Sequence, residues 1–565
     1  MSIATYSLYT TGGSVGCLSN DILRIVRQGA WWGMSLCLMV WLSACGSAGS
    51  SGSSAKAAVS GENAEAVGST NIVTSVGAMQ KGDLYLVDLS TGKATIVFSS
   101  GKTDATYKLV VQSTSTAAGN ATVTVGDVNA TPTTQVLKSI AVEAPKDAQE
   151  SLDRMLREAE QNLPRDPVVH KSMGKAVSKV PAVGDTDTFR VLSSLATTKS
   201  YKTVTATVQC ISAINADMNV VLYVEDVVKD AFTSAQIKEL CREYASSLAA
   251  EFSVLGYPSD INGDGSVAVV ATKVVNEIGG QLGGIVTGFF FGGDLNTRTE
   301  SGNPASNARE VVYHLVPDPT GKYGTAITAD FAMTNLLPAV VPHEVQHLLS
   351  YHSHVIEGNS GAEASWLNEA LSHLVEDVVG YGQENPSRIQ LMLASISNTG
   401  LITSGAPGLA ARGASYLFLR FLYEQSKNGN NFLSAMVHST ETGSDNIVTA
   451  FNGQSSSAKK WNDLLLRWGV ALAVSDQGVT TDSRYTYKSR SYDSQTSHWQ
   501  GVCLVCNADD GRNTSLSGPT QTSLSGTGTA QLAAGANAIY DISSPPSSLS
   551  VQGNSEMQGV LIRTK

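Results

Sequence analysis

The sequence predicts an α+β protein with a central domain of mixed strands and helices, flanked by small β-rich parts. Between about residues 72 and 140, short runs of β-branched and aromatic residues are separated by Gly, Ser, Asp and Thr, which is typical of a small β-sandwich. Short strands with Ser, Gly and Thr turns return after residue 510. Residues 363–380 instead carry leucine and valine at helical spacing before a glycine stop.

The chain is longer than one ordinary domain and carries few charges. It has 565 residues, so we expect two or three domains. Apolar residues make up 42% and charged residues 15%, which indicates a packed globular protein. The net charge of −11 argues against nucleic acid as a partner and against electrostatic attraction to anionic lipid.

The N-terminal region has the pattern of an export signal. Arg24 and Arg27 precede an apolar run over residues 31–42 that is too short to span a bilayer. The Leu-Ser-Ala-Cys sequence ending at Cys45 resembles the bacterial lipobox, in which the cysteine is acylated after cleavage. The resemblance implies anchoring to the bacterial membrane, at the outer membrane or cell surface in a Gram-negative organism; an ordinary secretory signal is the alternative. The Gly/Ser/Ala-rich residues 46–70 would form a flexible tether.

The most informative motif is His343-Glu344-Val345-Gln346-His347. Histidines four residues apart lie one above the other on a helix, so both imidazoles can reach a single ion. Glu344 would lie beside that ion, where a carboxylate can take a proton from zinc-bound water. An amphipathic helix whose two histidines share a face by chance is the competing interpretation. A catalytic zinc also needs a third protein ligand and one open position.

The third ligand is expected on a second helix. A metzincin would need glycine at position 350 and histidine at position 353, but both residues are serine. Ser360 and Glu363 form a capping-box pattern that begins a helix further along. On that helix, Glu369 shares a stripe with polar residues while the leucines occupy the opposite side. Glu369 is therefore the predicted third ligand.

A His-Glu-x-x-His helix followed by an Asn-Glu helix is the layout of the gluzincin peptidases, and the chain resembles the hyicolysin family of zinc metallopeptidases over roughly residues 185–500. The motifs that carry this resemblance are Trp366-Leu367-Asn368-Glu369, Ser306-Asn307 with Glu310 and Tyr313, the glycine-aromatic run at residues 288–295, and Tyr416 to Leu422. The resemblance implies a gluzincin-like domain that holds Zn²⁺. It also implies that an edge strand at residues 311–315 could hold a peptide by β-augmentation.

Two positions depart from the gluzincin pattern. Gluzincins commonly place a carboxylate one turn after the glutamate ligand, to orient a zinc-bound histidine, whereas this chain has His373. The partner of that histidine is then Glu376 or Asp377. Pro342 precedes the first histidine directly, so the active-site helix must begin close to it or kink there.

These patterns together predict a zinc-dependent endopeptidase that hydrolyses peptide bonds in extracellular or surface proteins. Zinc would be held by His343, His347 and Glu369, with Glu344 as general base. Tyr416 and His373 are candidate donors to the oxyanion, although a structural role fits each of them as well.

Two other functions compete with this one. A surface-anchored, non-catalytic binding lipoprotein with a structural or vestigial zinc site would also carry a lipid anchor and β domains. An aminopeptidase would need an additional acidic anchor for the substrate amine, and no exopeptidase motif is recognisable. The expected partners are a protein or peptide substrate and, through Cys45, a membrane.

Two further groups of residues have ligand or cross-link chemistry. Asp260, Asn262 and Asp264 alternate before a glycine at the sixth position, as in the first half of a calcium loop. Position twelve is alanine, which excludes an EF-hand and leaves Ca²⁺ binding or a plain Asx turn. In an exported protein, disulfides are expected among four cysteines, for which three connectivities exist: Cys210, Cys241, Cys503 and Cys506.

The predicted organisation is a signal region with lipobox at 1–45, the tether at 46–70, a β-sandwich-like domain at 71–145, a linker helix within 146–184, the zinc metallopeptidase domain at 185–505 and a C-terminal β domain at 510–565.

Overall fold

The computed structural model describes residues 73–76, 79–98, 104–127, 135–136, 147–163, 180–488, 490–494, 498–505 and 516–565. The chain divides into two compact units, Met1–Lys56 and Ala57–Lys565, and all described residues belong to the second unit. The predicted signal region, the tether and Cys45 lie outside the described residues. Among the helices of the described ranges, none combines the length and apolar character that crossing a bilayer requires. The prediction of a mixed α+β fold is confirmed.

The central part of the chain is built on a six-stranded mixed sheet with the order β11-β12-β10-β9-β8-β7. Its strands are β7 (Thr186–Leu192), β8 (Tyr201–Ala213), β9 (Asn219–Glu225), β10 (Ser266–Ala271), β11 (Gly288–Phe290) and β12 (Val311–His314). Strand β10 runs parallel to β9 and β12, and the remaining pairs are antiparallel. Strands β10 and β12 are buried along their whole length, which explains their continuous apolar sequence.

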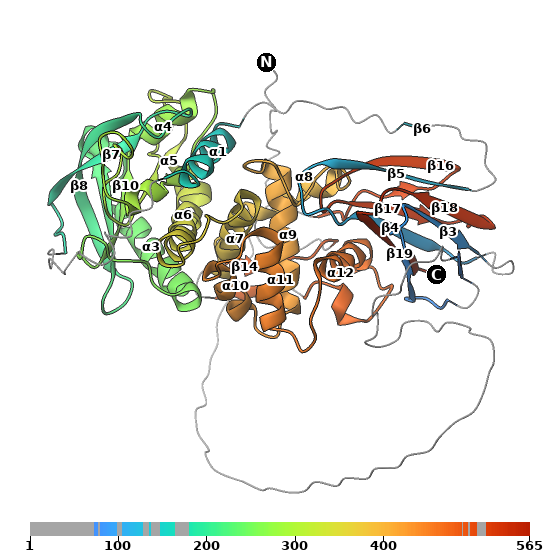
Figure 1. The fold of residues 1–565 in the computed structure, drawn as a ribbon. Coiled ribbons are helices and arrows are strands. Elements are labelled where there is room, and N and C mark those ends of the chain that lie inside the picture. The colour runs from blue at the N-terminus through green and yellow to red at the C-terminus, as the bar shows by residue number, and fades with distance from the viewer. Residues whose placement is uncertain are drawn as a thin grey trace, which may run out of the picture. The chain divides into compact units, whose positions relative to one another are not determined.

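Two long helices pack against each other and against this sheet (Figure 1). Helix α3 (Ser234–Leu255) contacts β8 and β9, and helix α6 (Leu337–Tyr351) contacts β11 and β12. The capping box of Thr233 and Gln236 fixes the start of α3. Helix α6 begins five residues before Pro342 and follows a π-helical turn, η3 (Ala332–Leu336). Pro342 is therefore inside the helix, where its missing N–H removes one backbone hydrogen bond.

The other helices lie around this pair or on the far side of α7 (Figure 1). They are α1 (Ala148–Glu160), α4 (Lys273–Gly280), α5 (Ala329–Phe331), α7 (Ser365–Val378), α8 (Asn385–Ala394), α9 (Leu409–Gln425), α10 (Gly429–Val437), α11 (Gly443–Gly453) and α12 (Trp461–Val474). Short 3₁₀ or π turns form η1 (Asp226–Ala231), η2 (Gly292–Leu295), η4 (His352–Glu357) and η5 (Ser483–Tyr485), and β13 (Ser491–Asp493) pairs with β14 (His498–Gln500). Helix α9 packs against both α7 and α8, and α7 packs on α6.

The segments from the two ends of the described chain interleave in one β-sandwich. One sheet has the order β1 (Val73–Ser75), β3 (Lys93–Val97), β18 (Ser548–Gln552), β5 (Asn120–Asp127), β16 (Thr527–Ala533), β6 (Gln135–Val136). The other has the order β15 (Thr522–Ser523), β17 (Asn537–Ile542), β4 (Tyr107–Ser113), β19 (Met557–Arg563), β2 (Leu84–Val87). Each segment alone would leave strand edges unpaired, so the separate domains expected at 71–145 and 510–565 are joined into one.

The sandwich has its own core and also contacts the helices. Leu109, Val123 and Leu549 are buried between its two sheets. Strand β4 is buried on both faces because its outer face packs on α12. There Gln112 donates a hydrogen bond from Nε2 to Leu465 O over 2.8 Å.

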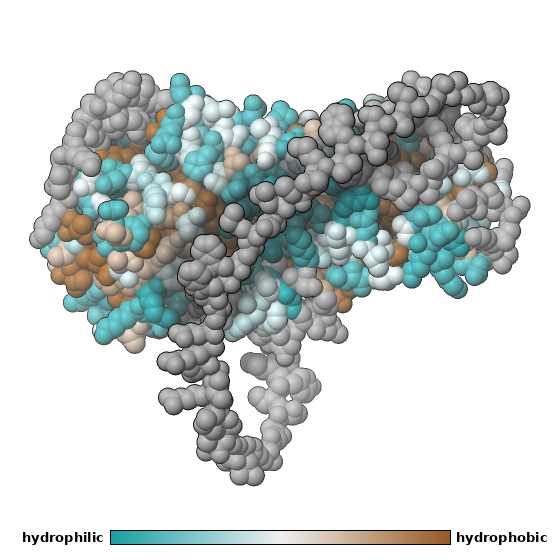
Figure 2. All heavy atoms as spheres, turned by 90° about the horizontal axis from the view of Figure 1, so that it is seen from below, coloured by the Kyte–Doolittle hydropathy of each residue, from teal (hydrophilic) through white to brown (hydrophobic). Residues whose placement is uncertain are grey.

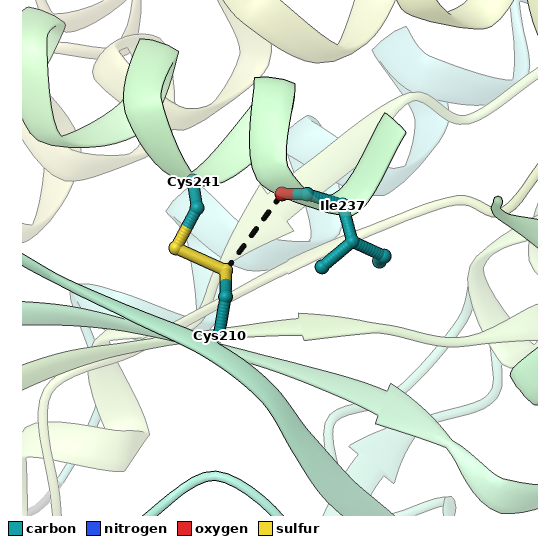
Figure 3. Close-up of a disulfide and its surroundings, with 3 residues drawn as sticks. All are labelled: Cys210, Ile237 and Cys241. Carbon is teal, nitrogen blue, oxygen red and sulfur yellow. Dashed lines mark hydrogen bonds between the residues drawn. A yellow bond between two sulfur atoms is a disulfide. The ribbon is translucent and has the colours of Figure 1, made fainter. Parts of the chain in front are cut away.

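A disulfide between Cys210 and Cys241 joins β8 to α3 (Figure 3). It is one of the pairings that the four predicted cysteines allow. Cys503 is disulfide-bonded as well, and Cys506 lies outside the described residues. Cross-linking the sheet to α3 holds the helix on which α6 packs.

The described surface has few large exposed apolar side chains. On the face seen in Figure 2, hydrophobic residues are interspersed with hydrophilic ones. Val227, Tyr257 and Leu282 are among the large apolar residues that are more than a third exposed. Single exposed residues of this kind are normal on protein surfaces.

Helices α8 and α9 cross closely at Gly413, where a Cβ atom would lie 2.3 Å from Arg388 O. We expect Gly413→Ala to lower the free energy of unfolding by about 1–3 kcal/mol, although alanine is the better helix former. Urea denaturation would measure this against Gly453→Ala, a helical position with open space around it. Equal stability of the two variants would contradict the close crossing.

Candidate metal centre

Helices α6 and α7 bring the three predicted ligands together. His343 Nε2 lies 3.5 Å from Glu369 Oε2, and His347 Nε2 lies 3.4 Å from Glu369 Oε1. One ligand atom from each of these buried residues lies within 4.8 Å of the other two. The histidines share one face of α6 because they are four residues apart, and Glu369 faces them from the second turn of α7. The group could hold a metal ion.

Glu376, which follows Glu369 along α7, orients the ring of His343. Its Oε1 lies 2.7 Å from His343 Nδ1, so the other ring nitrogen, Nε2, faces Glu369. Asp377, the other predicted partner, points elsewhere: it accepts from Arg420 Nη1 over 2.9 Å and from Gly501 N over 3.0 Å.

His373 contacts the same Glu376 oxygen, with its Nδ1 at 3.1 Å. His343, His373 and Glu376 form a second group that could hold an ion, and it shares His343 with the first.

The electrostatics of the site follow from burial and from the neighbouring carboxylates. Burial alone would lower the pKa of His343, but Glu369 and Glu376 outweigh it and raise that pKa to about 10. Burial and Arg157 lower the pKa of His347 to about 4. Burial raises the pKa of Glu369, but Arg412 and the two histidines hold it well below its usual range. The site therefore presents an ionised carboxylate to two histidines, of which one carries a proton.

Glu344 lines a cavity of about 70 Å³, here called the metal cavity, together with His343, His373, Arg388 and Arg412. Its Oε2 accepts a hydrogen bond from Phe290 N over 2.8 Å. Burial raises the pKa of Glu344 to about 7, and Asp153 and Glu369 add to this effect while His343 opposes it.

The edge of the sheet next to α6 is strand β11. Residues 311–315 were predicted as the edge strand, but β12 lies between β11 and β10 and both its edges are paired. The glycine-aromatic run at residues 288–295 forms β11 and η2.

Side chains of α1 occupy the outer edge of β11. Gln149 accepts from Thr287 N over 2.9 Å and donates to Gly288 O over 3.1 Å. Arg157 donates to Phe290 O over 3.2 Å, and Glu160 accepts from Gly292 N over 3.0 Å. The helix expected as a linker is therefore packed beside the candidate site.

Tyr416 does not line the metal cavity. It is buried on α9 and lines a separate small cavity with Gly382 and Asn385. Of the two predicted oxyanion donors, His373 alone is placed at the metal cavity.

The predicted calcium ligands are engaged by protein donors. Asp260 Oδ1 accepts from Gly265 N over 3.1 Å, and Asn262 Oδ1 accepts from Asp264 N over 3.3 Å, as in an Asx turn. Asp264 accepts from Ser266 Oγ over 2.6 Å and pairs with Arg309 Nη2 at 3.1 Å. Asn262 donates to Asp264 Oδ2 over 2.7 Å. All three side chains thus have protein partners, and Ca²⁺ binding at this loop stays a prediction.

Sequence reasoning missed Arg412 and Asp153. Arg412 Nη1 lies 2.7 Å from Glu369 Oε2, and Arg412 Nη2 is hydrogen-bonded to Asp153 of α1. Because 259 residues separate Arg412 from Asp153, no local pattern could have predicted the contact.

Searches for relatives do not extend this picture: no family model matches the sequence, and no curated protein matches it.

A buried histidine outside the metal centre gives a pH prediction. His314 Nε2 lies 3.2 Å from Tyr244 Oη, His314 Nδ1 lies 2.7 Å from Leu315 O, and burial lowers the pKa of His314 from 6.5 to about 4. Between these values the unfolded chain binds a proton that the folded chain does not bind, so stability falls as the pH falls. We expect His314 to account for about 2–3 kcal/mol of lost stability at pH 4.5 relative to pH 7.

Urea denaturation of the metal-free protein at both pH values would measure this loss. His314→Gln should lose correspondingly less stability than the wild type on acidification. An equal loss in both proteins would contradict the prediction.

Proposed function

We propose that this protein is a zinc-dependent endopeptidase. The observation that carries the proposal is the convergence of His343 Nε2, His347 Nε2 and Glu369, with Glu344 lining a cavity beside His343. Ligand atoms about 2.1 Å from a tetrahedral Zn²⁺ are about 3.4 Å apart. Each histidine nitrogen lies at about that distance from one oxygen of Glu369: His343 Nε2 is 3.5 Å from Oε2 and His347 Nε2 is 3.4 Å from Oε1.

A bound Zn²⁺ would supply Lewis-acid activation of water and of the scissile carbonyl group. Glu344 accepts the proton of the attacking water and returns it to the leaving amine; a pKa of about 7 suits both transfers at neutral pH. Glu376 holds the ring of His343 through Nδ1. His343 must release its proton when it becomes a ligand, so metal binding should weaken as the pH falls.

The oxyanion of the tetrahedral intermediate requires a cationic or N–H donor besides the ion. The pKa of His373 is lowered to about 3 by burial, so its ring is neutral. Its Nδ1–H donates to Glu376, which leaves Nε2 as an acceptor. Arg388 lines the same cavity, is half-buried and has no carboxylate in ion-pair contact among the described residues. We therefore propose Arg388 as a candidate donor to the oxyanion, in place of His373 and Tyr416.

Export and lipid anchoring at Cys45 belong to the same proposal. The Cys210–Cys241 disulfide supports an oxidising compartment outside the cytoplasm. The substrates would then be extracellular or surface proteins and peptides.

Metal content and cleavage of casein, with and without chelator, would test the proposed function. We expect one zinc per chain and cleavage that the chelator abolishes and added Zn²⁺ restores. Absence of bound metal, or cleavage that persists in chelator, would overturn the proposal.

A further inference from the structure

Arg412 is the buried cation nearest to the carboxylate of the metal group. It lies in the first turn of α9 and is 5% exposed. Its Nη1 pairs with Glu369 Oε2 at 2.7 Å, its Nε donates to Pro407 O over 2.9 Å, and its Nη2 is bonded to Asp153. Three sides of the guanidinium are therefore fixed by three separate parts of the chain.

We propose that Arg412 is the positioning residue of Glu369 and that Asp153 holds Arg412 in place, so that helix α1 forms part of the metal centre. This inference rests on the proposed zinc site. The guanidinium is a planar fork whose donors have fixed directions, so it fixes the carboxylate in angle as well as in position. With Oε2 paired to Arg412, Oε1 remains on the side of His347 Nε2, 3.4 Å away.

The position of α1 supports a permanent role for Asp153. Leu152 and Leu156 on α1 are fully buried in the main core, so the helix is held independently of the ion pair. Gln149 donates to Asp153 Oδ1 over 2.8 Å, which leaves Oδ2 to Arg412. Without Asp153, Glu369 would be the one carboxylate paired with Arg412. The guanidinium could then shift together with Glu369 instead of holding it in place.

Arg420 provides a matched comparison on the same helix. It is also buried and also bridges two carboxylates, with Asp377 at 2.9 Å and Glu424 at 2.8 Å. It does not line the metal cavity. An arginine whose role is only to stabilise α9 would behave like Arg420.

The test is the dissociation constant for Zn²⁺ alone, measured by competition with a chromophoric chelator. We expect Arg412→Met to raise it about 10- to 100-fold and Arg412→Lys to raise it less, because lysine restores the charge without the fork. Asp153→Asn should also raise it but should add little to Arg412→Met, since it acts through Arg412. Arg420→Met should leave it within about threefold of wild type, below the effect expected at an outer-shell partner.

The outcomes separate this inference from the proposed function. If wild type binds no Zn²⁺, both fail. If wild type binds Zn²⁺ but Arg412→Lys and Asp153→Asn bind it equally well, the positioning role alone is overturned. A raised KM with an unchanged dissociation constant for Zn²⁺ would also overturn it, because Arg412 would then contact substrate. Should Arg412→Met fail to fold, the other two variants carry the test.

Discussion

A Glu344→Gln variant is expected to bind zinc as tightly as wild type and to lose about 100- to 10,000-fold in kcat. Glutamine has nearly the shape of glutamate but cannot accept a proton at neutral pH. Glu344 belongs to neither group of residues that could hold an ion, so the ligands remain in place. Steady-state cleavage of a fluorogenic casein, with zinc content measured on the same samples, would give both quantities.

The matched control for this variant is Glu251→Gln. Glu251 is buried on α3, its two oxygens have no hydrogen-bond partner among the described residues, and it does not line the metal cavity. It therefore tests whether any buried Glu→Gln change near α6 is enough to impair turnover. Full activity in Glu344→Gln would contradict the assignment of the general base, whereas equal losses in both variants would point to a structural effect.

Removal of the metal is expected to lower the free energy of unfolding by several kcal/mol. An ion present at about 1,000 times its dissociation constant stabilises the folded state by about 4 kcal/mol. His347→Ala removes one of the three ligands and should abolish this gain. We expect chelator to lower the thermal midpoint of wild type by several degrees and to leave that of His347→Ala unchanged.

His352→Ala is the control for the metal variant. His352 begins the π-helical turn after α6, is only partly buried and belongs to neither group that could hold an ion. Its variant should keep both the zinc and the chelator-sensitive midpoint. A wild-type midpoint that does not respond to chelator would argue against a bound structural or catalytic ion.

Local periodicity predicted the parts of the site that lie on one helix. The four-residue spacing of His343 and His347 places them on one face of α6 whatever surrounds it. Glu369 was predictable because the leucines of its helix occupy the other face. The start of α6 was less predictable, because Pro342 is tolerated inside the helix rather than at its beginning.

The sequence did not decide between two neighbouring residues when the choice depended on how their helix is rotated about its axis. Glu376 and Asp377 are adjacent, so their side chains point about 100° apart around α7. Packing of α7 between α6 and α9 turns Glu376 to His343 and Asp377 to Arg420. Only the tertiary contact distinguishes the two carboxylates.

The sequence by itself determined the chemistry of this protein: two histidines and a glutamate with metal-ligand spacing, a neighbouring carboxylate and an α+β frame. The tertiary structure decided which residues support that chemistry. It joined the two β segments into one sandwich, made β11 rather than β12 the edge strand, and placed α1 against Arg412. Local patterns encode the direction of a side chain within its own element, whereas contacts between distant segments form only when the elements pack.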